Sequence, residues 1–193
     1  MEGANGAAAV IRNDERRWGA VAQALHWLMA AMVIVMLGLG WYMNDLPRGP
    51  HQLQMYRLHA SLGLTVLALI VIRLGWRLAN RRPAYPAHMR PWERKAAKTA
   101  HFLLYALLLI QPAIGYLQVN AANFPLVVWG VLPLPSLLAP NEPLAETLIG
   151  FHGFIANILG ALVLLHIAAA LRHHFWLKDD VLRRMLPGTS APR

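Results

Sequence analysis

Two histidines, His152 and His166, enclose an apolar stretch near the C-terminal end of the chain, HGFIANILGALVLLH. They lie 14 residues apart. A helix would therefore place both imidazoles on one face, about four turns or roughly 21 Å apart along its axis. Neutral imidazoles are axial ligands of haem iron. The spacing thus predicts two ligand positions at two depths of one helix.

Histidines in other apolar stretches can complete these positions. His26, in ALHWLMA, and His59, in RLHASLGL, each lie near the N-terminal end of their stretch. In antiparallel helices His26 matches the depth of His166, and His59 matches the depth of His152. Two pairs of imidazoles at two heights suit two haems, each ligated from both faces. Depth alone leaves His101 open as an alternative to His26.

The same 14-residue step links each of these partners to a residue at the other depth. From His26 it reaches Gly40, at the depth of His59 and His152. The bare backbone of a glycine there would let the porphyrin ring of the haem at that depth pass close to the helix. From His59 it reaches Arg73, whose guanidinium could pair with the propionates of the inner haem.

The elements that position these residues are predicted to be membrane helices. Of the 193 residues, 57% are hydrophobic and only 14% are charged, which is typical of a membrane protein. Residues 20–43, 58–78, 96–119 and 148–173 are each apolar for about the 20 residues that cross roughly 30 Å of hydrocarbon. We expect an all-α fold, a bundle of four transmembrane helices over residues 18–186, with mobile tails at 1–17 and 187–193.

The basic residues predict the orientation of the bundle. Of 18 lysines and arginines, 16 lie before the first stretch, in or beside the segment that joins the second stretch to the third, or at and beyond the end of the fourth. Only Arg48 and Arg57 lie on the other side. The positive-inside rule therefore places both termini in the cytoplasm. The net charge of +9 follows from this topology, and no nucleic-acid partner is needed to explain it.

Absences narrow the chemistry further. The sequence contains no cysteine, which excludes disulfides, iron–sulfur clusters and the covalent attachment of a c-type haem. A histidine-rich metal or proton transporter is disfavoured, because such proteins place polar groups near the midplane of repeated architectures. Here the histidines avoid the midplane and the sequence has no internal repeat.

Five motifs carry a resemblance to a known family: RWGAVAQALHWLMA, RLHASLGL, KTAHFLLYALLLIQPAIGY, FHGF and LLHIAAALRHHFWLKDD. Together they resemble the bacterial cytochrome b561 family, in its superoxide oxidase-like branch. The resemblance implies a four-helix protein of the bacterial inner membrane that holds two b-type haems and exchanges electrons with ubiquinone. It also implies that His26 and His166 ligate the inner haem, and that His59 and His152 ligate the outer one.

The last motif suggests a quinone site. His173 follows His166 by seven residues, so it lies on the same helix face about 10 Å closer to the cytoplasm. Histidine can hydrogen-bond a quinone carbonyl and deliver protons, and the resemblance adds a basic residue at the start of the third helix. We predict that His173 or His174, with Lys95 or Lys98, binds quinone. Alternatively, these residues anchor the helix end in the membrane interface.

On the outer side, Arg48, His51 and Arg57 gather beside His59 in the loop PRGPHQLQMYR. They could bind haem propionates or attract an anion such as superoxide, and Arg57 is the favoured member. This side carries a net charge of −1 in all, so any attraction must be local. His88, in the cytoplasmic loop, is expected to be solvated.

The expected function is electron transfer across the inner membrane by a superoxide:ubiquinone oxidoreductase. Superoxide would be oxidised at the outer side and ubiquinone reduced near the cytoplasmic face. The alternative is a cytochrome b subunit that relays electrons between a dehydrogenase or hydrogenase partner and the quinone pool. No nucleophile or acid–base triad is apparent in the sequence.

Overall fold

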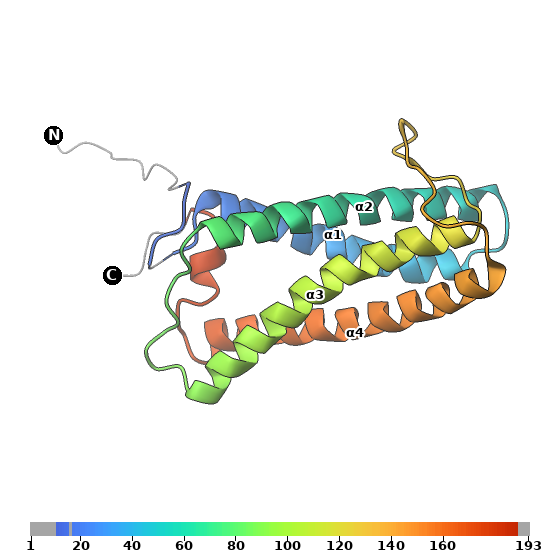
Figure 1. The fold of residues 1–193 in the computed structure, drawn as a ribbon. Helices are drawn as coiled ribbons and strands as arrows, with labels where there is room; N and C mark the ends of the chain where they lie inside the picture. Colours follow the sequence, from blue (N-terminus) through green and yellow to red (C-terminus); the bar gives the residue numbers. More distant parts are fainter. Residues whose placement is uncertain (1–10, 16, 189–193) are drawn as a thin grey trace.

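The computed structural model describes residues 11–15 and 17–188, so residues 1–10 and 189–193 of the two predicted tails lie outside the described residues. Four long helices form an antiparallel bundle: α1 (Ala20–Asp45), α2 (Pro50–Ala79), α3 (Pro91–Ala121) and α4 (Glu142–Phe175) (Figure 1). Each is long and apolar enough to cross a membrane. Every predicted span lies within one of these helices, which confirms the four-helix membrane fold.

Three of the four helices, α2, α3 and α4, begin where the sequence supplies N-terminal signals. Pro50 and Pro91 occupy first-turn positions of α2 and α3, where a missing N–H costs nothing. Asn141 caps α4, its side-chain oxygen accepting a hydrogen bond from the Leu144 amide at 3.1 Å. These signals lie outside the apolar stretches, and so the helices are longer than the spans predicted from hydropathy.

Large apolar side chains cover the outside of the bundle. Phe102 is 71% exposed and Leu164 69% exposed, whereas only a few side chains, such as Met29 and Ile70, are fully buried. In water such a surface would be an aggregation liability. It is the expected surface of helices surrounded by lipid.

Within the described part of the chain, both ends of the polypeptide lie at the same end of the bundle, which we call the terminal end (Figure 1). There α2 and α3 diverge, and a C-terminal segment, residues 176–188, turns back from the end of α4 toward the start of α1 (Figure 1). This segment includes the short 3-10 helix η1 (Arg183–Met185). It is held to α1 by the side chains of Gln23 and Trp27, which donate to the carbonyls of Arg184 at 3.1 Å and Met185 at 2.7 Å.

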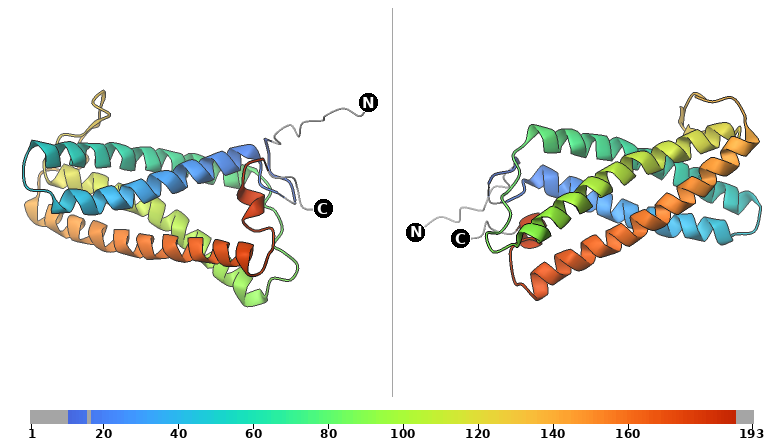
Figure 2. Two further views of the ribbon diagram at one scale, coloured as in Figure 1. Left: turned by 180° about the vertical axis from the view of Figure 1, so that it is seen from behind. Right: turned by 60° about the horizontal axis from the view of Figure 1, so that its bottom comes forward.

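The opposite end carries a short β-hairpin between α3 and α4, formed by β1 (Val127–Val128) and β2 (Leu132–Pro133). It stands out from the side of the bundle (Figure 2). Trp129 secures it, because its amide donates to Ser61 Oγ at 3.0 Å and its indole N–H donates to Thr65 Oγ1 at 3.2 Å. The hairpin therefore rests against the side of α2, at a level slightly deeper than His59.

Candidate functional site

Three histidines from three helices converge at the level nearer the terminal end. The ring centres of His26 on α1 and His166 on α4 lie 6.2 Å apart, with the ring planes at 71°. His101 on α3 lies closer to His166, at 5.4 Å between ring centres. The structure thus brings together the predicted inner pair and also the alternative ligand.

The second pair lies toward the opposite end. The ring centres of His59 on α2 and His152 on α4 are 6.1 Å apart, with the planes at 74°. The Nδ1 atoms of both rings are buried, and neither has a hydrogen-bond partner among the described residues. A buried polar atom without a partner is costly, so these nitrogens indicate a site that something else completes.

Both pairs have the dimensions of a bis-imidazole haem site. Metal–imidazole bonds of about 2 Å on each side, plus about 1 Å to each ring centre, place two axial rings roughly 6 Å apart. Within the described ranges, no group of three or more His, Asp or Glu side chains could hold a bare metal ion. Two imidazoles suffice when a macrocycle supplies the remaining ligands.

Glycines on two helices leave room beside the second pair. A Cβ built on Gly40 would lie 3.4 Å from Cε1 of His59, and one on Gly115 would lie 3.0 Å from Cε1 of His152. Gly40 was predicted from its spacing to His26. Gly115 was missed, because nothing in the sequence shows which face of α3 meets α4. The donor set, the unpartnered nitrogens and the bare backbone together fit haem at this level.

Two arginines add positive charge at the level nearer the terminal end, where the three histidines meet. Arg73 on α2 donates from Nη2 to Nδ1 of His26 at 2.9 Å. The guanidinium carbons of Arg73 and Arg77 lie 5.8 and 5.1 Å from the ring centre of Tyr105 on α3. Neither arginine has a carboxylate partner in the described part of the chain, which suits the binding of carboxylates such as haem propionates. Arg77 and Tyr105 were not predicted, although a four-residue step places Arg77 on the same face as Arg73.

The predicted quinone residues lie in different surroundings at the terminal end. His173 is buried, and His174 has a buried Nδ1 with no partner among the described residues. Lys95 and Lys98 are exposed on the first turns of α3. Neither lysine hydrogen-bonds to these histidines in the described structure, so the structure does not bring the four residues into one contact network.

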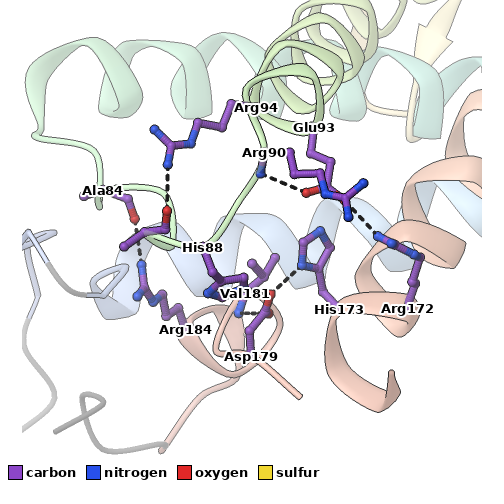
Figure 3. A network of polar contacts seen from close by, with 11 residues as sticks. Ala84, His88, Arg90, Glu93, Arg94, Arg172, His173, Asp179, Val181 and Arg184 are labelled. Atoms are coloured by element: carbon purple, nitrogen blue, oxygen red, sulfur yellow. Dashed lines mark hydrogen bonds and ion pairs between the residues drawn. The ribbon is translucent and has the colours of Figure 1, made fainter. Parts of the chain in front are cut away.

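The carboxylate of Asp179 instead binds His173 (Figure 3). Its Oδ2 accepts from Nδ1 of His173 at 2.6 Å and from Nε2 of His88 at 3.1 Å, and its Oδ1 accepts from the Val181 amide at 3.0 Å. His88, expected to be solvated, is 56% exposed at its side chain but also forms this bond. Asp179 was missed because its partners come from two other segments.

The hydrogen bonds of Asp179 predict that the thermal stability of the protein depends on pH. Burial raises the pKa of Asp179, but the bonds from His173, Val181 and His88 outweigh it and hold the pKa below the ordinary 3.8. The stabilisation is therefore present above pH 3.8 and is lost as the pH falls through the lower pKa of the folded state. We expect Asp179→Asn to lower the midpoint of thermal unfolding at pH 7 but not below that pKa. Asp180→Asn should leave the midpoint unchanged at both pH values. If Asp179→Asn differs from the wild type by the same amount at both pH values, the prediction is contradicted.

The loop residues predicted at the opposite end do not form a cluster. Arg48 and Arg57 are exposed and have no hydrogen-bond or ion-pair partner within the described residues. His51 pairs instead with the hydroxyl of Tyr42, at 3.2 Å from its Nε2. The two arginines remain available to solutes at this end of the bundle.

Comparisons with known proteins agree with this architecture. The family model described as prokaryotic cytochrome b561 matches residues 17–188. The chain is 33% identical to cytochrome b561 homolog 2 of Escherichia coli over 186 residues, covering 93% of this chain and 96% of that protein. It is 29% identical over 176 residues to a protein of Yersinia pestis named probable superoxide oxidase CybB, covering 89% and 97%. It is 31% identical over 171 residues to cytochrome b562 of Cereibacter sphaeroides, covering 84% and 90%.

The whole four-helix bundle, including all five histidines at the two levels, falls within the matched residues. The chain therefore belongs to the prokaryotic cytochrome b561 family, whose members are multi-pass electron-transfer proteins of the bacterial inner membrane that carry haem b.

Proposed function

We propose that this chain is a di-haem cytochrome that oxidises superoxide at the opposite end of the bundle and reduces ubiquinone at the terminal end, which faces the cytoplasm. The observation that carries the proposal is the pair of histidine sites, at 6.2 and 6.1 Å between ring centres. His26 and His166 would hold one haem, and His59 and His152 the other. Bound there, the haems would supply one-electron transfer across the membrane.

The spacing supports His26 over His101 as the partner of His166. The His26–His166 distance matches that of the other pair, whereas the His101–His166 distance of 5.4 Å is shorter. His101 is then a neighbour of the site. Arg73 and Arg77 supply the charges that would bind propionates, and Tyr105 fixes their position from the neighbouring helix.

The two ends of the bundle suit different substrates. Superoxide is a small anion that gives up one electron and leaves as dioxygen. Arg57 and Arg48 are the exposed cations nearest to the His59 level. Ubiquinone is apolar apart from its head group, which the buried His173 could bind at the membrane interface. His174, Lys95 and Lys98 are further candidates for contacts with the head group.

The test is superoxide-driven reduction of a soluble ubiquinone analogue by the haem-loaded protein in detergent. We expect ubiquinol to form while superoxide is generated, and its formation to stop when superoxide dismutase is added. No reaction with superoxide, together with copurification of a dehydrogenase or hydrogenase, would instead favour the electron-relay subunit.

Arg57 provides a more specific prediction. A local cation raises the rate at which an anion reaches its site, and removing it lowers that rate, here by an expected factor of about 3 to 10. Arg57→Gln should therefore slow the superoxide-driven reaction and weaken its dependence on ionic strength. The same variant should react normally with a neutral one-electron donor. An unchanged rate with superoxide would exclude Arg57 from anion attraction.

A further inference from the structure

Asp179 is a carboxylate enclosed between two imidazoles from separate segments. Its side chain is 4% exposed, and that of His173 is 9% exposed. His173 belongs to the last turn of α4, His88 to the loop between α2 and α3, and Asp179 to the C-terminal segment. The backbone reinforces the contact, because the Asp179 amide donates to the His173 carbonyl at 3.1 Å.

The carboxylate fixes the state of the buried imidazole. Oδ2 of Asp179 lies 2.6 Å from Nδ1 of His173, so the proton on this side of the ring is held between the two groups. Nε2 has no hydrogen-bond partner in the described ranges, which leaves it as the nitrogen available to a ligand. In histidine, the hydrogen bond made by one ring nitrogen determines the protonation of the other.

We propose that Asp179 is the positioning residue of the quinone site. It holds His173 with Nδ1–H on the carboxylate and stabilises the imidazolium, so that Nε2 is the atom that delivers protons to the quinone. This inference rests on the proposed reduction of ubiquinone at the terminal end. His88 assists by donating to the same carboxylate oxygen, which keeps Asp179 from turning away.

The proton balance defines what His173 must do in this proposal. Conversion of a quinone to a quinol takes two electrons, which come from the reduced haems, and two protons, which come from water at the terminal end. In each delivery the Nε2–H bond of the imidazolium breaks and an O–H bond of the quinol forms. The neutral ring stays bonded to Asp179 through Nδ1–H and takes up the next proton from water.

The other charged groups drawn around His173 form hydrogen bonds to groups other than its imidazole. Glu93 on α3 interacts with His173 electrostatically, but its carboxylate binds Arg172 at 3.2 Å and the Arg90 amide at 3.0 Å (Figure 3). Arg184 of the C-terminal segment donates to the Ala84 carbonyl at 2.7 Å. Asp179 is therefore the carboxylate in direct contact with the imidazole.

The experiment compares quinone reduction by the haem-loaded wild type, Asp179→Asn, Asp179→Glu and the neighbouring control Asp180→Asn. Each protein is reduced chemically and mixed rapidly with decylubiquinone at a series of concentrations while haem reoxidation is followed. The rate at saturating quinone is written here as kcat, and the quinone concentration that gives half of that rate as KM. Because positioned acid–base groups contribute about 100-fold or more, we expect Asp179→Asn to lower kcat by at least tenfold. The KM for the quinone should change less than twofold, and the solvent isotope effect on kcat should rise. Asp179→Glu should recover part of the rate, and Asp180→Asn should behave like the wild type.

Three results would overturn the inference. One is a normal kcat in Asp179→Asn. Another is a loss confined to KM or to haem content, which would make Asp179 a structural link between the segments. In both cases the proposed quinone reduction by the wild type would stand. A wild-type protein that is not reoxidised by decylubiquinone would remove the proposed function itself, and the inference with it.

Discussion

Protein purified with His152→Ala is expected to hold one haem per chain, whereas the wild type is expected to hold two. His152 is the partner of His59 across 6.1 Å, and its removal leaves that site with a single imidazole. The other level lies roughly 21 Å away along α4, too far for the loss to spread by direct contact. We expect the same result for His59→Ala. The measurement is pyridine haemochrome content per chain, with reduced-minus-oxidised spectra that show which haem is missing.

A control variant, His51→Ala, sharpens this experiment. His51→Ala removes an exposed histidine at the same end of the bundle, one that pairs only with Tyr42, and it should leave two haems. Two haems retained in both His152→Ala and His59→Ala would disprove the pairing, and so would fewer than two in freshly prepared wild type.

The inner level requires a separate comparison, since three histidines meet there. His26→Ala should lose the inner haem, whereas His101→Ala should keep it with a shifted spectrum. The reverse pattern would make His101 the ligand and His26 its neighbour. Arg73 bears on this choice, because a guanidinium can only donate, and its bond to Nδ1 of His26 leaves the ring proton on Nε2. Nε2 can therefore bind iron only after Arg73 has moved to another acceptor, such as a propionate.

The sequence predicted the features that follow from helix periodicity and membrane thickness. The four spans were visible because about 20 apolar residues are needed to cross a bilayer. Depth matched His59 with His152 and placed His26 level with His166, since antiparallel helices of known length place residues at calculable heights, and the family resemblance then favoured His26 as the ligand. Depth could not separate His26 from His101, because α1 and α3 both begin at the terminal end of the bundle and each histidine lies near the beginning of its helix.

The features that were missed depend on tertiary contacts. Gly115 matters because α3 crosses α4 beside His152, and a crossing point is set by the packing of both helices. Asp179 lies in a segment with no periodicity, and its partner His88 is 91 residues away in another loop. Neither contact leaves a regular pattern in the sequence.

Gly115→Leu should also remove the outer haem, although neither of the proposed haem ligands is substituted. A Cβ at this position would lie 3.0 Å from Cε1 of His152 and 3.4 Å from its Nδ1, so even this one atom fits only if the imidazole shifts by a few tenths of an ångström. The larger side chain must displace the imidazole, because overpacking a helix contact costs about 1–3 kcal/mol and is relieved by moving the most mobile neighbour. Haem content should fall from two per chain toward one. Gly115→Ala, which adds only the Cβ, should keep two haems with an altered outer spectrum.

Gly38 offers a matched control for this test. No heavy atom lies within 4 Å of the Cβ that a side chain would add there, so Gly38→Leu introduces the same bulk into a membrane helix without a clash. It should retain both haems, and a loss in this variant would trace the effect to helix insertion. If Gly115→Leu also retains two haems, then His152 has room to move, and the bare backbone of α3 is not needed for the outer site. The expected pattern, in which only Gly115→Leu loses a haem while Gly115→Ala and Gly38→Leu keep two, would show that the outer site requires the close approach of α3 to His152.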